Sequence, residues 1–244
     1  MLKINRIIEI LRHPNSLLHP NTWSQEAFLK YLRSRGVKIG ARSRFINPDD
    51  TFIDIGRGDY ISIGEDCCLS TITILAHDYS WYTMLESKSD LLPACGGRVS
   101  IGNNCFIGFQ AVILKDTKIG DNVIIGARAV VKGVIPSNTV WAGCPARQIC
   151  TIDEYYEKKS KRRLRDACYR RDHVLMTKNR LPTIKEMGLF AVLFLERTEH
   201  NYSNYIKGLE FNGLTEDERV KHYFFNSTPI FSSFEEFLDY SINE

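Results

Sequence analysis

The sequence predicts a mainly β protein in which a parallel β-helix is followed by a helical C-terminal extension. Three observations support this prediction: aliphatic residues recur at every sixth position, a small or β-branched residue follows most of them by four positions, and the period changes beyond Cys150. A fixed short period indicates a repeat architecture, and six is a period of parallel β-helices. An α-helix would instead repeat its apolar residues every three or four positions.

The repeat is regular between Ile101 and Val131. Each hexad corresponds to a short strand and a turn, three hexads make one coil, and stacked coils bury a column of β-branched side chains that suit a pleated wall. We expect the glycines that follow most of these residues to provide the backbone freedom that a sharp corner needs. The aliphatic column is Ile101, Ile107, Ile113, Ile119, Ile125 and Val131, and the small or β-branched column is Cys105, Ala111, Thr117, Val123 and Ala129.

Length and composition limit the class of protein. A chain of 244 residues can form one large or two modest domains. Its 43% hydrophobic and 25% charged residues are ordinary for a soluble protein, and a net charge of +3 is too small to indicate nucleic-acid binding. The seven cysteines lack zinc-site spacing and indicate reduced thiols in a cytoplasmic protein. We expect no membrane span, because no run approaches the roughly 20 apolar residues that a span needs. We also expect no signal peptide, because segment 1–14 carries charges among its apolar residues.

Short helices are predicted before the coil, in a cap over residues 1–36. Apolar residues of segment 4–11 share one helix face, and Pro14 ends that helix because the residue before proline avoids the helical conformation. A second helix is predicted from about Ser24 to Ser34, with Gly36 as its stop.

The coil is predicted over residues 37–149, with two interruptions. The period slips between Asn47 and Asp59, which predicts a bulge or a small insertion. From Ala76 to Arg98 the hexads stop and then resume in phase, which predicts an inserted loop that projects from the coil. Loops on a rigid scaffold often carry function.

Residues 150–244 are predicted to form three or four helices. The period becomes 3.6, and the lysine- and arginine-rich run 158–165 is typical of a solvated helix face. Segment 187–195 is expected to be the most buried, through Met187, Phe190, Ala191, Leu193, Phe194 and Leu195. Four pairs have capping-box spacing: Thr151 and Glu154, Thr183 and Glu186, Thr215 and Glu218, and Ser233 and Glu236.

Three segments carry a family resemblance: IGNNCFIG, KIGDNVIIGARAVV and VWAGCPAR. They resemble hexapeptide-repeat acyltransferases, in particular the galactoside and maltose acetyltransferases and the polysaccharide O-acetyltransferases, over roughly Val37 to Ile149. The resemblance implies a left-handed parallel β-helix, although parallel crossovers in general favour the right hand. It also implies acetyl-CoA as co-substrate, no metal, and a homotrimer with active sites between subunits.

The resemblance places the catalytic base at His77, at the start of the predicted loop. Acyl transfer from a thioester to a hydroxyl needs a base and a group that holds the developing oxyanion. Histidine is the usual base because its ordinary pKa of ~6.5 lies near working pH. Asp78 is adjacent but points away on an extended chain, so a backbone carbonyl or Glu86 is as plausible an orienting partner. The alternative reading of His77 is a surface loop histidine.

The resemblance also implies the other site residues. The amide of Phe109, where several relatives carry serine, is expected to hold the oxyanion. The acceptor sugar is expected to contact polar residues of the phase slip and aromatic residues of the loop, although solvated turns and loop packing remain alternatives. The expected donor-binding residues are Phe109, Gly126, Ala127, Lys132, Ala142, Gly143 and Arg147, and the expected acceptor-binding residues are Asn47, Asp59, Asp78, Tyr79, Trp81 and Tyr82.

The sequence therefore predicts an acetyl-CoA-dependent O-acetyltransferase acting on a hydroxyl of a sugar or polysaccharide precursor. N-acetylation of an amino sugar or antibiotic on the same fold is the main alternative. A metalloenzyme of the γ-carbonic anhydrase type would need about three histidine ligands, and the coil offers only His77. A non-catalytic scaffold is disfavoured by the presence of both the His77 loop and the WAGCPAR segment.

Overall fold

A computed structural model describes residues 24–87, 95–207 and 218–241. The chain divides into two compact units between Tyr156 and Glu157. Three predicted features lie outside the described residues: the helix at 4–11, the middle of the loop at 88–94, and Thr215 of one capping box. The predicted domain limits at 36/37 and 149/150 stay predictions.

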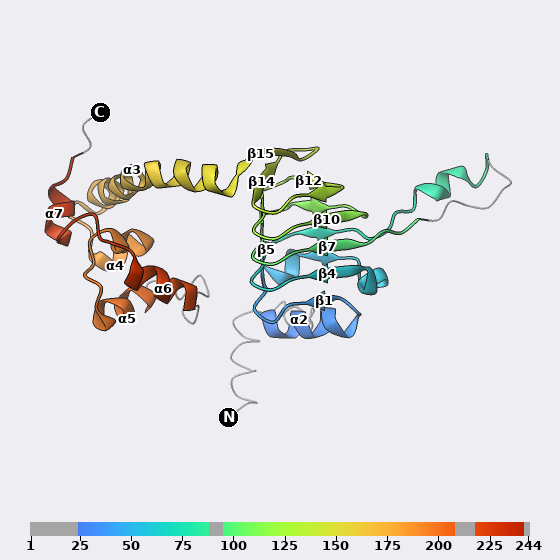
Figure 1. The fold of residues 1–244 in the computed structure, drawn as a ribbon, viewed down its shortest axis with the longest axis horizontal. Coiled ribbons are helices and arrows are strands. Elements are labelled where there is room, and N and C mark those ends of the chain that lie inside the picture. The colour runs from blue at the N-terminus through green and yellow to red at the C-terminus, as the bar shows by residue number, and fades with distance from the viewer. Residues whose placement is uncertain (1–23, 88–94, 208–217, 242–244) are drawn as a thin grey trace, which may run out of the picture. The chain divides into compact units, whose positions relative to one another are not determined.

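The first unit contains three parallel sheets that the chain visits in strict rotation (Figure 1). Each strand pairs with the strand three places along the chain, so each circuit of three strands stacks on the one before it. Among the strands that the structure describes, only β15 pairs antiparallel, with β14. Sheet A contains β1 (Lys38–Ile39), β4 (Ile61–Ile63), β7 (Val99–Ile101), β10 (Thr117–Ile119) and β13 (Val134–Ile135); sheet B contains β2 (Arg44–Ile46), β5 (Cys68–Ser70), β8 (Phe106–Ile107), β11 (Ile124–Ile125), β14 (Thr139–Ala142) and β15 (Arg147–Thr151); sheet C contains β3 (Phe52–Ile53), β6 (Thr73–Ile74), β9 (Val112–Ile113) and β12 (Val130–Val131).

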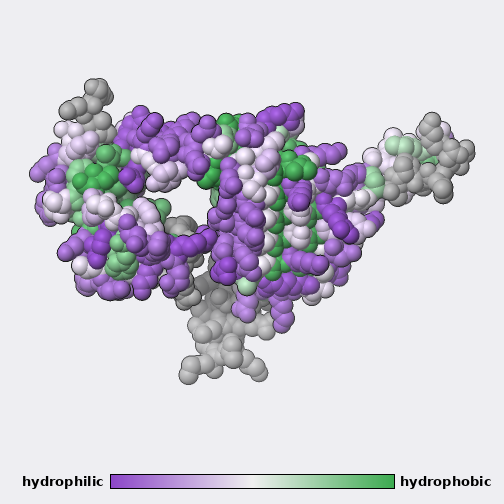
Figure 2. All heavy atoms as spheres, viewed as in Figure 1, coloured by the Kyte–Doolittle hydropathy of each residue, from purple (hydrophilic) through white to green (hydrophobic). Residues whose placement is uncertain are grey.

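The six-residue repeat forms the core of this coil, as predicted. All six residues of the aliphatic column are at most 3% exposed. Ile107 pairs with Ile125 and Ile113 pairs with Val131, so equivalent residues of successive coils lie one above the other. The small column is also buried, including Cys105. Apolar residues also form columns on the outer surface of the coil (Figure 2).

The predicted insertion before Asp59 is confirmed by the register of the strands. In the regular coils a residue pairs with the one three hexads along the chain, as Val99 does with Thr117. Lys38 instead pairs with Ser62, a full hexad further on than the regular repeat would place its partner. Two 3₁₀ turns occupy this longer coil: η2 (Pro48–Asp50) and η3 (Ile55–Tyr60).

The corner glycines are required by close contact between coils and not by their backbone conformation. Gly108 and the other glycines that follow repeat residues have no positive φ. A Cβ on Gly108 would lie 2.7 Å from the backbone nitrogen of Ala127 in the next coil. Positive φ angles occur instead at corner residues such as Asn104 and Asn122, at 53° and 55°. The expectation that these glycines provide unusual backbone freedom at the corners is therefore wrong.

Asparagines at the corner between sheets A and B form a ladder along the coil. The Nδ2 atom of Asn104 donates to Oδ1 of Asn122 at 2.9 Å, and Nδ2 of Asn122 donates to Oδ1 of Asn138 at 2.9 Å. Asparagine tolerates the left-handed conformation better than most residues and can also hydrogen-bond to its neighbour. Each asparagine therefore contributes to the corner in two ways.

Between β6 and β7 the chain leaves the coil as the predicted loop (Figure 1). The amide of Gly97 donates to the carbonyl oxygen of Ala76 at 2.8 Å, and His77 forms an antiparallel bridge with Gly96. These contacts hold together the two ends of the loop, residues 76–78 and 95–97, which are called here the neck. The part of the loop that leaves the coil, residues 77–87, is called here the outgoing leg and contains η4 (Ser80–Met84). The part that rejoins the coil from residue 95 is called the returning leg.

The helices partly match the predictions. Helix α2 (Gln25–Ser34) begins after Ser24, whose Oγ accepts from the Ala27 amide at 3.1 Å, so this helix is confirmed. Beyond the coil, the described residues contain five α-helices where three or four were expected. They are α3 (Ile152–Lys178), α4 (Ile184–Met187), α5 (Glu199–Lys207), α6 (Glu218–Asn226) and α7 (Phe234–Asp239), with the 3₁₀ helix η5 (Gly188–Leu193) after α4.

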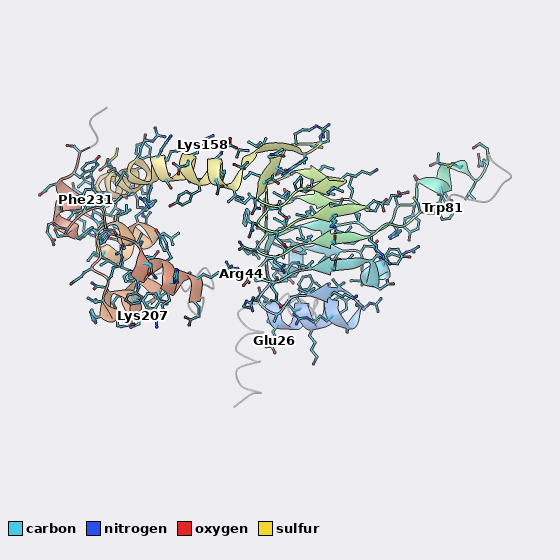
Figure 3. The ribbon with its side chains drawn as sticks, viewed as in Figure 1. Glu26, Arg44, Trp81, Lys158, Lys207 and Phe231 are labelled. Carbon is cyan, nitrogen blue, oxygen red and sulfur yellow. The ribbon has the colours of Figure 1, made fainter. Side chains whose placement is uncertain are left out.

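The second unit has its own apolar core, in which Phe224, Phe231 and Phe237 are buried (Phe231 is labelled in Figure 3). The predicted buried segment 187–195 belongs to this core, although Phe190 is only partly buried. The capping boxes at Thr151 and Thr183 are both formed. None of the described helices is both long and apolar enough to cross a membrane.

We predict that Asn122→Ala lowers the free energy of unfolding of the coil by about 2–4 kcal/mol. The left-handed conformation costs an alanine ~1–2 kcal/mol, and two exposed hydrogen bonds of ~0.5–1 kcal/mol each are lost. Asn122→Gly is the matched control, because glycine accepts the positive φ but also loses the ladder. Urea denaturation should show the alanine variant less stable than the glycine variant by about 1 kcal/mol. Equal stabilities would contradict a role for the backbone conformation.

Candidate active site

His77 lies at the corner where the chain passes from sheet C to sheet A, called here the C–A corner. Its Nδ1 atom is hydrogen-bonded to Oδ2 of Asp54. Asp54 directly follows β3, and the pairing of Ile53 with Ile74 in sheet C places it beneath the start of the loop. The same Oδ2 atom accepts from the Ala76 amide at 3.2 Å. The Asp54 side chain is 6% exposed, whereas that of His77 is 23% exposed.

This geometry decides which nitrogen of His77 is available. A carboxylate accepts hydrogen bonds, so the proton of a neutral His77 is on Nδ1. Within the described residues, Nε2 makes no hydrogen bond. The rings of His77 and Tyr79 pack edge to face, with their centroids 4.8 Å apart and their planes at 85°. The arrangement therefore leaves Nε2, on a partly exposed side chain, able to accept a proton.

Asp54 was not expected from the sequence, which suggested Glu86 or a backbone carbonyl as the partner of His77. A signal was present, because Asp54 is an acidic residue within the aliphatic run FIDI, one coil before His77. The irregular length of that coil hid the pairing. Phe52 pairs with Thr73, which lies half a hexad beyond the position that the regular repeat would give.

A second cluster of charged residues lies at the neck of the loop. Asp78 forms an ion pair with Lys115, which belongs to the C–A corner of the next coil. Cys95, on the returning leg, contacts both residues. The hydrogen bond from Lys115 holds the pKa of the Asp78 carboxyl well below its ordinary value, and the same contact raises the pKa of Lys115. Both groups are therefore charged near neutral pH.

Most of the predicted donor-binding residues gather at a different corner, where the chain passes from sheet B to sheet C (the B–C corner). Phe109 and Ala127 occupy equivalent positions in successive coils, and the Arg128 amide donates to the Phe109 carbonyl oxygen at 2.8 Å. The amides of Phe109 and Ala127 donate no hydrogen bond to any described residue. A Cβ on Gly126 would lie 2.9 Å from the Cβ of Ala142, so close packing explains both small residues. The corner thus presents unpaired amides between small side chains.

The other predicted residues divide between the two corners. Lys132 and Asp59 are exposed at the C–A corner, and Asn47 is exposed at the B–C corner. Arg147 is exposed where β15 pairs with Ala142. Gly143 follows Ala142, and its φ of 97° favours glycine at that position.

The two corners flank sheet C. The segment 110–114 crosses this wall, which at ~3.3 Å per residue spans roughly 16 Å. His77 and the Phe109 amide of the same chain therefore cannot contact one reacting group.

Aromatic residues line the outgoing leg of the loop beyond His77. Tyr79 and Tyr82 are 70% and 69% exposed, and Trp81 lies between them with ring centroids 6.4 Å and 6.2 Å away (Trp81 is labelled in Figure 3). The contact between Tyr79 and His77 joins this aromatic surface to the candidate base.

Among residues 24–87, 95–207 and 218–241, no three His, Cys, Asp or Glu side chains are grouped so that they could hold a metal ion. Potential ligands occur near His77, but Asp54 is hydrogen-bonded to the ring and Asp78 is paired with Lys115.

Known proteins resemble the chain in its coil. Residues 98–133 match the family model described as bacterial transferase hexapeptide (six repeats). Galactoside O-acetyltransferase of Escherichia coli (strain K12) is 32% identical over 133 residues, which is 51% of this chain and 61% of that protein. WbbJ of the same organism, whose name assigns it to lipopolysaccharide biosynthesis as an O-acetyl transferase, is 31% identical over 40% of this chain and 54% of its own length. The chain thus spans between half and two thirds of each of these relatives.

One of the matching solved structures is a galactoside acetyltransferase in complex with coenzyme A. The match covers 61% of this chain and 83% of that one, with 24% identity and a TM-score of 0.41. The six-residue repeat, the match of residues 98–133 to the family model and the acetyltransferase relatives together support a hexapeptide-repeat acyltransferase coil in this chain.

Proposed function

We propose that this protein is an acetyl-CoA-dependent O-acetyltransferase that acts on a hydroxyl of a sugar or of a polysaccharide precursor. The observation that carries the proposal is the His77–Asp54 pair, a partly exposed imidazole whose Nδ1 atom is held by a buried carboxylate. The names of the relatives, a galactoside O-acetyltransferase and an O-acetyl transferase of lipopolysaccharide biosynthesis, support a carbohydrate acceptor.

In this proposal His77 is the general base. Its Nε2 atom accepts the proton of the acceptor hydroxyl while the hydroxyl oxygen attacks the thioester carbonyl carbon. Asp54 holds the ring and stabilises the imidazolium that forms. When the carbon–sulfur bond breaks, His77 returns the proton to the departing sulfur, so the products are the acetyl ester and the free thiol.

Most of the donor-binding residues of the proposal lie at the B–C corner. The unpaired amides of Phe109 and Ala127 fit the carbonyl oxygens of an extended pantetheine arm, and the amide of Phe109 is the candidate for the oxyanion. Gly126, Ala142 and Gly143 carry no long side chain that would block close approach of the arm. The exposed charges of Arg147 and, at the C–A corner, of Lys132 are suited to phosphates.

The proposal requires more than one copy of the chain. Because one wall separates His77 from Phe109, a complete site needs the C–A corner of one copy and the B–C corner of another. We therefore propose a homotrimer with three sites between subunits. This arrangement, like the left-handed sense of the coil, follows the resemblance of the repeat to hexapeptide acyltransferases.

The proposed base is tested by His77→Ala. We predict a fall in kcat of ~10²–10⁴-fold, because a general base contributes that much to rate. Coenzyme A affinity, measured by calorimetry, should stay nearly unchanged, since the donor corner is intact. The assay is thiol release from acetyl-CoA with a panel of sugar hydroxyl and amino acceptors, which also separates O- from N-acetylation. A variant with full activity would place the base elsewhere.

The orienting role of Asp54 is tested by Asp54→Asn. An asparagine amide can turn its NH₂ group towards Nδ1 and so favour a proton on Nε2, where it blocks base catalysis. We predict a loss in kcat of about 10²-fold or more, with the Michaelis constant for acetyl-CoA unchanged. Asp116→Asn is the matched control, because it removes an exposed carboxylate from the same corner. Equal effects of the two substitutions would count against the dyad.

The shared site is tested by mixing two inactive variants. His77→Ala removes the base, and Ala127→Trp fills the exposed donor corner. Co-refolding equal amounts should restore about a quarter of native activity, because one interface in four combines an intact base with an intact donor corner. Sedimentation should show a trimer. A mixture that stays inactive, or a monomer at micromolar concentration, would contradict the shared site.

A further inference from the structure

The carboxylate of Asp78 is fully engaged by protein groups. Its Oδ1 atom accepts hydrogen bonds from the amide of Ser80 at 3.1 Å and from Oγ of Ser80 at 2.5 Å. This is an Asx turn, which fixes the backbone two residues ahead of the aspartate. It begins η4, the helical turn that contains Trp81 and Tyr82. One oxygen of Asp78 therefore orders the aromatic leg of the loop.

The other oxygen of Asp78 connects the loop to the coil. Oδ2 pairs with Nζ of Lys115 and accepts a hydrogen bond from Sγ of Cys95 at 3.3 Å. Asp78 lies on the outgoing leg, Cys95 on the returning leg, and Lys115 on the coil above. Lys115 also donates to the Cys95 sulfur. The three side chains thus join both legs of the neck to a rigid element.

The ion pair is partly shielded from solvent. The Lys115 side chain is 19% exposed and that of Asp78 is 38% exposed. Partly exposed ion pairs contribute little to the stability of a whole protein. Their effect is expected to be local, on the geometry of the two legs that they join.

The neck is also the place that holds His77. The carbonyl oxygen of Ala76 accepts a hydrogen bond from the amide of Gly97. His77 forms its antiparallel β-bridge with Gly96, the residue immediately after Cys95. Tyr79, the residue after Asp78, packs its ring against His77. A shift of either leg would therefore move the aromatic surface relative to Nε2.

We propose that Lys115 is a positioning residue, which through Asp78 and Cys95 sets the loop and its aromatic surface against His77 for the acceptor. This inference rests on the proposed function and deepens it, because it assigns Lys115 and Asp78 to the acceptor side of the reaction. In it Asp78 anchors the loop and is not itself a ligand of the sugar, since both of its oxygens are occupied.

The test compares three substitutions. Lys115→Met removes the ammonium and keeps most of the side-chain length, Lys115→Arg restores a cation, and Asp78→Asn removes the charge but retains an oxygen for the Asx turn. Lys118→Met is the matched control, since it removes an exposed ammonium from β10, on the same coil. Thermal unfolding confirms that each variant is folded.

Two measurements follow the neck and the reaction separately. Alkylation of Cys95 by iodoacetamide, followed by peptide mass spectrometry, reports whether the legs have separated. It is measured at about pH 10, above the ordinary thiol pKa of ~8.5, so that the rates follow access to the sulfur and not the loss of the Lys115 charge. Steady-state kinetics report the Michaelis constants for acceptor and for acetyl-CoA.

We expect Lys115→Met and Asp78→Asn each to accelerate Cys95 alkylation and to reduce kcat/KM for the acceptor by roughly tenfold, as misplaced reacting groups do. The Michaelis constant for acetyl-CoA should not change. Lys115→Arg should recover most of both effects, and Lys118→Met should resemble the native protein. The double variant Asp78→Asn/Lys115→Met should be no worse than either single variant, because the two residues act as one unit.

Native alkylation rates in Lys115→Met, or kinetic losses that multiply in the double variant, would overturn the inference. Equal losses for acceptor and acetyl-CoA, without rescue by arginine, would also overturn it, because they indicate general damage to the fold. If the native protein transfers no acetyl group to any acceptor, the proposed function fails, and the alkylation rates alone then decide whether Lys115 holds the neck.

Discussion

The structure of the first unit depends on the parallel pairing of backbones in successive coils. Each regular coil returns the chain to the same register after three hexads, so that every repeat residue lies above its equivalent. Coils stacked this closely leave no room for a side chain at several corners, where glycine is required by contact with the next coil. The residues that need a left-handed backbone are a separate set, and asparagines among them link the coils through their side chains.

Such a scaffold places chemical groups by their position in the repeat. Residues that follow sheet C gather at the C–A corner, where Asp54, His77 and Lys115 come from three successive coils. Residues that follow sheet B gather at the B–C corner, where unpaired amides lie between small side chains. Because a wall of sheet C separates the two corners, the proposed reaction would need the B–C corner of a second copy. The inserted loop departs from the repeat, and its neck is fixed by the contacts of Asp78 with Lys115 and Cys95.

Regular periodicity made much of the fold predictable. The strands between Ile101 and Val131, the loop after Ala76 and helix α2 were all predicted, because each has a local signal in periodicity or capping. The partner of His77 was not predicted, since Asp54 lies in a coil whose irregular length obscures the register. The conformational role assigned to the corner glycines was wrong because a sequence does not reveal how closely two backbones approach.

The candidate site was predictable only in part, for a related reason. His77 was predicted as the base because it matches the loop position of the catalytic histidine in similar acyltransferases, and that role stays a prediction. The ion pair between Asp78 and Lys115 joins residues that are distant in the sequence and depends on how the loop rejoins the coil. The number of C-terminal helices was underestimated, because α4 (Ile184–Met187) is a single turn and too short for a periodic signal.

The central claim is that Asp54 fixes the tautomer of His77 and so frees Nε2 for the acceptor. Nuclear magnetic resonance of protein labelled with ¹⁵N in its histidines reads this directly, with His77→Ala used to assign the signals. We predict that neutral His77 carries its proton on Nδ1, with a strongly hydrogen-bonded proton there and an unprotonated Nε2. A neutral ring protonated on Nε2, or one that exchanges freely between the two tautomers, would contradict the claim.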